Sequence, residues 1–187
     1  MKKAVYGAQT DHPDIARSYN NIGNAYDCLG EYTSALKYYN KSLEMRKAVY
    51  GAQTDHPDIA LCYNNIGKAY KSLGEYTSAL ENHNKSLEMW KAVYGAQTDH
   101  PDIALSYNNI GNVYWSLGEY TSALEYYNKS LEMRKAVYGA QTDHPDIATS
   151  YNNIGNAYNC LGEYISALEY HNKSLEMKKA IKLKVGT

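Results

Sequence analysis

A nearly perfect internal repeat of 44 residues limits what this chain can fold into. The string Ala-Val-Tyr-Gly-Ala-Gln-Thr-Asp ends at four positions separated by that interval: Asp11, Asp55, Asp99 and Asp143. A period of this length is typical of small helical units that bury their apolar faces by stacking on copies of themselves. We therefore expect one stacked array over residues 1–187 without separate domains. It would consist of a leading tail over 1–11 and repeats over 12–55, 56–99, 100–143 and 144–187.

The first half of each repeat has the spacing of an amphipathic helix. In the first copy, large residues follow one another at intervals of four, three, four and three: Ile15, Tyr19, Ile22, Tyr26 and Leu29. A strand would need a period of two. Pro13 suits the first helical turn, where its missing N–H costs nothing, and Gly30 suits a left-handed helix end. Either Asp11 or His12 is the expected N-cap.

A second helix accounts for the rest of the repeat. It is expected to begin near Thr33, a capping residue type, and to run through Val49 to Tyr50, ending at Gly51. Its inward positions are Ala35, Leu36, Tyr39, Ser42 and Leu43. Each repeat is thus predicted to be an antiparallel helical hairpin, and the fold class is all-α with eight helices.

Composition and charge exclude several classes of protein. The 19 Lys and Arg against 20 Asp and Glu leave a formal net charge of −1, whereas a nucleic-acid binder needs a basic face. No apolar run approaches the ~18 residues of a membrane span, and no signal-peptide core follows the N-terminus. Three cysteines cannot all pair with one another. We expect a reduced, cytoplasmic chain with no nucleic-acid or membrane partner.

These residues resemble the tetratricopeptide repeat family. The family's alternation of large and small residues is found in Tyr-Asn-Asn-Ile-Gly-Asn-Ala-Tyr over 19–26, and then in Gly30, Tyr32, Ala35, Tyr39 and Leu43. The usual unit has roughly 34 residues, and here a longer second helix and loop extend it. Ser42 replaces a late alanine. The longer unit resembles the kinesin light chain and nephrocystin type. The resemblance implies a right-handed α-solenoid of four 44-residue hairpins.

The resemblance also implies a function, which is a non-enzymatic scaffold that binds a peptide or partner segment in its concave groove. The columns of Arg17, Asn24, Asp27 and Cys28 on the first helix differ between copies, and these residues lie on one stripe with Asn20. In tetratricopeptide arrays this stripe lines the groove. By resemblance, the groove residues are Arg17, Asn20, Asn24, Asp27, Asn64, Lys68, Lys71, Leu105, Asn108, Asn112, Trp115, Asn152, Asn156 and Asn159.

The variation on this stripe has two open interpretations, a ligand surface or neutral drift on a solvated face. Asparagine amides can pair with the backbone of an extended peptide whatever its sequence. Some family members clamp a carboxylate at these columns, and Lys68, Asn64 and Asn109 fit part of that pattern. Leu105 and Thr149 stand where further cations are expected, so a full clamp is not predicted.

The charges and apolar residues of the stripe specify a ligand further. Positive charge is concentrated in the first two copies, at Arg17, Lys68 and Lys71, while Leu105 and Trp115 make the third copy more apolar. The matching ligand is an extended segment that is acidic at one end. It carries a bulky apolar side chain about one repeat further on.

No residue pattern indicates catalysis, a cofactor or a metal. The histidine of the Asp-His-Pro-Asp string, first His12, recurs at the start of a helix in every copy, which favours a capping role. His83 and His171 occupy the column of Tyr39 and are expected to pack there or point to water. The alternative to a ligand-binding scaffold is a structural array that self-associates end to end, or a fragment of a longer array.

Overall fold

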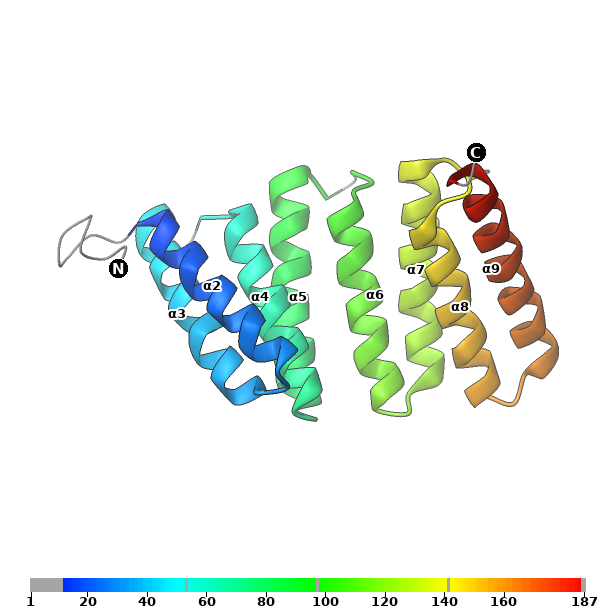
Figure 1. Ribbon diagram of the computed structural model, residues 1–187, viewed down its shortest axis with the longest axis horizontal. Helices are drawn as coiled ribbons and strands as arrows, with labels where there is room; N and C mark the ends of the chain where they lie inside the picture. Colours follow the sequence, from blue (N-terminus) through cyan, green and yellow to red (C-terminus); the bar gives the residue numbers. More distant parts are fainter. Residues whose placement is uncertain (1–11, 53, 97, 141, 186–187) are drawn as a thin grey trace. The chain divides into compact units, whose positions relative to one another are not determined.

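The computed structural model describes residues 12–52, 54–96, 98–140 and 142–185, and these form helices and no strand (Figure 1). The eight helices are α2 (Pro13–Cys28), α3 (Tyr32–Tyr50), α4 (Pro57–Ser72), α5 (Tyr76–Tyr94), α6 (Pro101–Ser116), α7 (Tyr120–Tyr138), α8 (Pro145–Cys160) and α9 (Tyr164–Val185). They form four successive antiparallel hairpins, so the all-α fold class is confirmed. The predicted tail over 1–11 lies outside the described residues.

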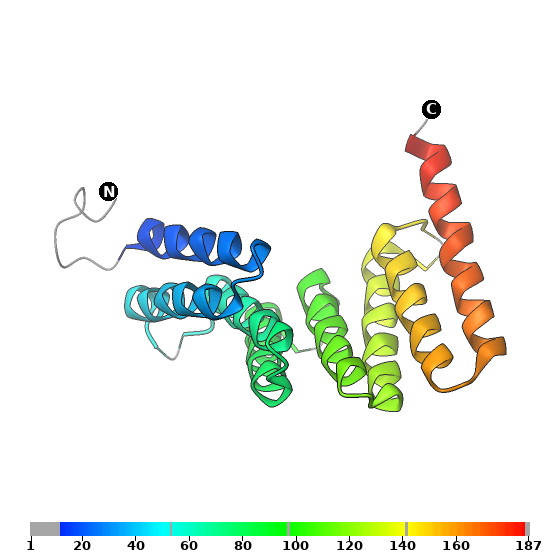
Figure 2. The same cartoon turned by 60° about the horizontal axis from the view of Figure 1, so that its bottom comes forward.

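The chain divides into two compact units, Met1–Ala96 and Gln97–Thr187. Each unit contains two hairpins, α2–α3 and α4–α5 in the first and α6–α7 and α8–α9 in the second. Within a unit, the two helices of a hairpin pack together, and the second helix of one hairpin packs on the first helix of the next. Figure 2 shows consecutive helices of each unit side by side.

The N-cap of the first helix of every hairpin is the histidine. His12 has an extended backbone, and its Nδ1 accepts a hydrogen bond of 3.2 Å from the backbone N–H of Asp14. The same bond recurs in the other hairpins, at His56 (3.1 Å), His100 (3.2 Å) and His144 (3.2 Å). The predicted capping role of these histidines is therefore confirmed.

A tight turn joins the two helices of each hairpin. Gly30 has φ +76°, its N–H donates to the carbonyl of Asp27, and the Glu31 N–H donates to the carbonyl of Tyr26. This is a Schellman arrangement, which favours glycine because an L side chain is strained at positive φ. Glu31 also serves as the N-cap of α3. The second helix thus begins at Tyr32, and Thr33, the predicted start, lies inside it.

The core contains most of the predicted inward positions, with two exceptions on the first helix. Those predicted for the second helix are buried in α3. Leu29, the C-cap residue at the hairpin turn, is 73% exposed, against 38% for its counterpart Leu73. Ile22 is 39% exposed, whereas its counterpart Ile66 on α4 is 2% exposed because it packs in the cluster with Ala35 and Leu36 of α3.

Small residues allow the two helices of a hairpin to cross closely. A Cβ added at Gly23 would lie 2.6 Å from two ring atoms of Tyr39, so only glycine fits there. Ser42 is fully buried, and its Oγ donates a hydrogen bond of 2.8 Å to the carbonyl of Ala16. Ser42, which replaces the family's usual alanine, therefore has a structural role through its hydroxyl.

Candidate functional site

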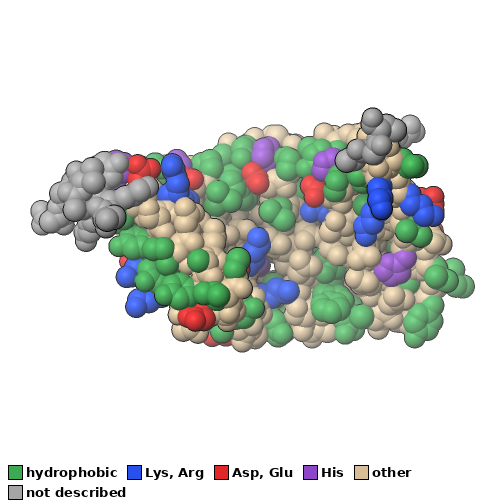
Figure 3. Space-filling model, in the orientation of Figure 1, with side chains coloured by type: hydrophobic (Ala, Val, Ile, Leu, Met, Phe, Trp, Pro, Cys, Tyr) green, Lys and Arg blue, Asp and Glu red, His purple; other side chains and the backbone are tan. Residues whose placement is uncertain are grey.

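The variable columns of the first helices lie on exposed or partly exposed surface in both units. In the first unit, the Arg17 side chain is 67% exposed and pairs with Asp14 at 3.4 Å, and Lys68 is exposed. In the second unit, Leu105 and Trp115 are 37% and 42% exposed. Figure 3 shows acidic and basic side chains interspersed over the face drawn there. Variation in these four columns therefore lies outside the core.

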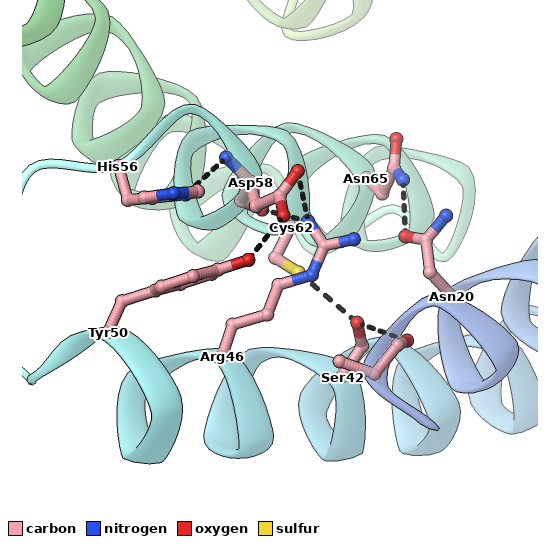
Figure 4. Close-up of polar contacts among 9 residues, drawn as sticks. Asn20, Ser42, Arg46, Tyr50, His56, Asp58, Cys62 and Asn65 are labelled. Atoms are coloured by element: carbon pink, nitrogen blue, oxygen red, sulfur yellow. Dashed lines mark hydrogen bonds and ion pairs between the residues drawn. The ribbon is translucent and has the colours of Figure 1, made fainter. Parts of the chain in front are cut away.

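Two of the predicted groove asparagines connect neighbouring hairpins. The Oδ1 atom of Asn20 accepts a hydrogen bond of 3.0 Å from Nδ2 of Asn65, which joins α2 to α4 (Figure 4). Asn108 accepts the equivalent bond of 2.9 Å from Asn153 and is 8% exposed. Spacing within one helix could not reveal Asn65 as a partner, because the bond joins different repeats. Some of the predicted groove asparagines thus hold neighbouring hairpins together.

Other predicted asparagines bind the second helix of their own hairpin. Asn24 Oδ1 accepts a hydrogen bond of 2.9 Å from the Tyr39 hydroxyl, and Asn112 accepts the same bond from Tyr127. Burial, together with the charge of Asp27, raises the pKa of Tyr39 to about 12. The tyrosine is therefore a neutral donor at all physiological pH values. The remaining asparagines on the stripe are buried at Asn64, partly exposed at Asn152, and exposed at Asn156 and Asn159.

The second hairpin departs from this Tyr–Asn pattern. His83 replaces the tyrosine, and Lys68 replaces the asparagine that accepts its hydroxyl. The His83 ring is 1% exposed, lies against Gly67, and has no hydrogen-bond partner on either nitrogen among the described residues. Burial first, then the positive charges of Lys68 and Lys71, lowers its pKa to about 4. The ring is neutral at pH 7 beside two cations.

His171, the other histidine of this column, is partly exposed. Its Nε2 lies 3.2 Å from Nδ2 of Asn159. Both histidines therefore pack in this column, His83 against Gly67 and His171 against Gly155, and His171 also has a polar partner.

A buried arginine on the second helix is a structural residue that the sequence patterns did not single out. Arg46 is 7% exposed, and its Nη1 donates to the backbone carbonyl of Asp58 and lies 3.4 Å from the Asp58 carboxylate (Figure 4). In the second unit, Arg134 Nη1 donates to the carbonyl of Asp146 and to Ser150 Oγ, both at 2.7 Å. Its position could have indicated this burial, because Arg46 follows Leu43 by one helical turn on the inward stripe.

Two cavities lie outside the predicted groove. One of about 710 Å³ is lined by Asp55, Tyr63, Glu81, Asn84, Lys85, Glu88, Met89 and Ala92. The other, of about 360 Å³, is lined by Tyr19, Lys41, Glu44, Met45 and Ala48, which are the counterparts of five of these residues in the first hairpin. None of the predicted groove residues lines either cavity.

The described residues contain no group of three or more His, Cys, Asp and Glu side chains placed to hold a metal ion. None of the helices described is long and apolar enough to cross a membrane.

Successive helical hairpins with small residues at their crossings define an α-helical repeat protein. Two family models described as tetratricopeptide repeat match the chain, one over residues 58–136 and 102–180 and the other over residues 15–58. The chain therefore belongs to the tetratricopeptide repeat family, as predicted. A comparison with curated proteins gives no match.

Solved structures show the same fold. BtubC (BKLC) from P. vanneervenii has a TM-score of 0.80 at 23% identity, over 91% of this chain and 66% of that one. The apo form of RapI has a TM-score of 0.79 at 20% identity, over 98% of this chain and 62% of that one. The chain thus spans less than two thirds of the length of either protein. At these identities the likeness concerns the fold.

Proposed function

We propose that the first unit binds an extended acidic segment of a partner protein along the exposed stripe of α2 and α4. Tetratricopeptide repeats generally mediate protein–protein interactions. The observation that carries the proposal is the pair of lysines on α4. Lys68 and Lys71 lie one turn apart, and neither has a carboxylate partner among the residues that the structure describes.

Electrostatics favours an anionic ligand at this place. Like charges one turn apart on a helix repel each other, and a bound carboxylate would relieve that repulsion. The neutral His83 ring behind them adds no charge of its own, so both ammonium groups remain available to the ligand. Arg17 is exposed on α2 of the same unit. An aspartate- or glutamate-rich segment matches this surface.

The second unit offers a different kind of contact on its own stripe. Leu105 and Trp115 lie on α6 and are both more than one third exposed. Exposed aromatic residues are frequent anchors of protein interfaces. We assign this part of the stripe to a bulky apolar side chain of a partner.

The acidic-segment proposal is tested with peptides selected from a random library for binding to the wild-type chain. Lys68→Glu should weaken their binding about tenfold or more and make the remaining affinity less sensitive to salt. The matched control is Lys37→Glu, which makes the same change of charge at an exposed position where the other three copies already carry glutamate. Selected peptides without acidic residues, or an equal loss in both variants, would contradict the proposal.

We also propose, as a second candidate function, that copies of the chain associate through the outer face of α9. Leu168 and Leu175 on this helix are 64% and 49% exposed, whereas their counterparts Leu36 and Leu43 on α3 are 9% and 8% exposed. The latter pack in a cluster with Ile59 and Ile66 of α4. On α2, Ile22 is the counterpart of Ile66 and is 39% exposed, so the first helix of another copy offers an apolar contact for α9.

A further inference from the structure

A second helix packs on the first helix of the next hairpin once in each unit, α3 on α4 and α7 on α8. In both contacts, leucines of the second helix lie in one cluster with isoleucines of the first. In the second unit these are Leu131 of α7 with Ile147 and Ile154 of α8. The two contacts show what covers the outer side of a second helix in this fold.

Helix α2 leaves exposed the side that α4 buries. Ile22 is 39% exposed, against 2% for its counterpart Ile66, which packs in the cluster with residues of α3. Ala25 is exposed, whereas its counterpart Ala69 is fully buried in the same cluster. Asn21 is also exposed and lies on the same side of the helix, four positions before Ala25. We call Asn21, Ile22 and Ala25 the α2 face.

Helix α9 leaves exposed the side that α3 buries. Leu168 and Leu175, which we call the α9 face, occupy the columns of Leu36 and Leu43. They are 64% and 49% exposed, whereas both residues of α3 are less than 10% exposed. Each chain therefore presents, on two different helices, both halves of the contact that its own α3 and α4 make.

A pair of asparagines holds the internal contacts in register. An Nδ2 donates to an Oδ1 between the first helices of successive hairpins, from Asn65 to Asn20 at 3.0 Å (Figure 4) and from Asn153 to Asn108 at 2.9 Å. The two columns continue to the outermost first helices. Asn152 of α8 stands in the acceptor column, and Asn21 of α2 stands in the donor column. The polar pair that fixes the register is thus available between two copies.

A pair of opposite charges follows the same pattern. Arg46 of α3 lies 3.4 Å from the carboxylate of Asp58 at the start of α4. Lys178 of α9 stands in the column of Arg46, and Asp14 of α2 stands in the column of Asp58. Both signs of charge are therefore kept on the two outer helices.

We propose that copies of this chain join head to tail, with the α9 face of one copy packed on the α2 face of the next. This junction rests on the self-association proposed for α9, and it adds the partner surface, the register and the direction. The register is that of α3 on α4, so Asn21 pairs with Asn152, and Lys178 pairs with Asp14. Because the two faces differ, each added copy leaves one face of each kind free, and the assembly can grow beyond a dimer.

The first experiment blocks one face at a time in the full chain and follows assembly by sedimentation velocity. Leu168→Glu blocks the α9 face and Ile22→Glu blocks the α2 face, because an unpaired carboxylate is costly to bury. Each variant alone should be monomeric at concentrations where the wild type forms dimers and larger species. An equimolar mixture of the two should form dimers and nothing larger, since it contains one intact face of each kind.

Two further variants keep this comparison decisive. Leu117→Glu makes the same change at an exposed position outside both faces and should assemble as the wild type does. Ala25→Lys places a long side chain where the counterpart alanine is fully buried. It should behave as Ile22→Glu does, which keeps the test valid if the glutamate lowers the melting temperature.

Other modes of association give different results. If two α9 faces bind each other, the wild type stops at the dimer and Ile22→Glu still dimerises. That outcome would overturn the head-to-tail junction and leave the self-association through α9 in place. A wild-type chain that stays monomeric would instead remove the self-association itself, and the junction with it.

The second experiment tests the register. Asn21→Ala and Asn152→Ala should each weaken association about fivefold, because each leaves the other amide without its partner. The double variant should lose little more than either single variant, since both changes remove one hydrogen bond. Losses that multiply in the double variant would show that the two asparagines do not pair, and would overturn the proposed register.

Discussion

Two equivalent positions in each hairpin show how a buried polar side chain finds its hydrogen-bond partner. The Tyr39 hydroxyl finds its acceptor in Asn24, fifteen residues earlier, and Tyr127 finds the same acceptor in Asn112. In the second hairpin both members differ, since His83 lies opposite Lys68. A lysine ammonium cannot accept a hydrogen bond. The buried imidazole is therefore held by packing against Gly67 rather than by a polar partner.

This burial makes stability depend on pH in a definite window. The pKa of His83 is about 4 in the folded chain, below the ordinary value of 6.5. Between these values the unfolded chain binds a proton that the folded chain does not, so lowering the pH should destabilise the fold by up to about 3 kcal/mol. The double variant His83→Tyr, Lys68→Asn should lose this contribution. Urea unfolding of both proteins at pH 4.5 and 7 measures it, and equal pH dependence would refute it.

The junction between two hairpins of one unit combines an N-cap, stacked rings and a hydrogen bond. The Tyr138 ring at the end of α7 stacks on the His144 ring at 3.6 Å, and its hydroxyl donates to the Asp146 carboxylate at 3.1 Å. Tyr50 and His56 repeat this arrangement between α3 and α4. In each unit, the second helix of the first hairpin is thus fixed to the helix that follows it. The additional length of the unit, compared with the usual repeat, supplies the tyrosine that makes this contact.

Removing the histidine should separate its two roles. His144→Ala loses the cap acceptor and the stacked ring and should destabilise the chain by about 1–2 kcal/mol. His144→Asn keeps an acceptor at the N-cap and should lose roughly half as much. Chemical denaturation of the two variants gives the comparison, with the exposed Lys129→Ala as control. If alanine and asparagine prove equally costly, the cap contributes nothing measurable.

The helices were predictable from this sequence because the proline and glycine residues at their ends recur every 44 residues. Pro13, Gly30 and Gly51 marked helix boundaries to within a residue or two, and the spacing of apolar residues identified the faces. Contacts between repeats were not predictable, because helical spacing relates only residues of one helix. For this reason Arg46 and the Asn20–Asn65 bond emerged only from the packing of α3 and α2 on α4. The predicted groove residues remain a prediction.

Each unit of the molecule is stabilised by its own set of contacts between hairpins. The first has the Arg46–Asp58 and Asn20–Asn65 pairs, and the second has their counterparts from Arg134 and Asn108. Each also has its own buried cluster, around Ile59 and Ile147 respectively. The same set of contacts therefore joins the two hairpins in each unit.

If the exposed face of α9 binds another copy, the chain should associate as its concentration rises. Leu175→Glu places a charge in the apolar face and should weaken this association about tenfold or more, because an unpaired carboxylate is costly to bury. Leu117→Glu is a suitable control, since Leu117 is also exposed but caps the end of α6. Sedimentation velocity over a range of concentrations gives the measurement. A monomer at all concentrations would rule out the association.

The Tyr–Asn pairs affect which recombination events between the repeated coding segments keep the fold intact. Tandem DNA copies this alike can recombine with one another, and an unequal exchange joins the start of one copy to the end of another. A breakpoint between the codons for residues 68 and 83 would set a tyrosine opposite Lys68, leaving a buried hydroxyl without its amide acceptor. An exchange of whole hairpins thus keeps each pair together, while an exchange inside the second hairpin separates Lys68 from His83.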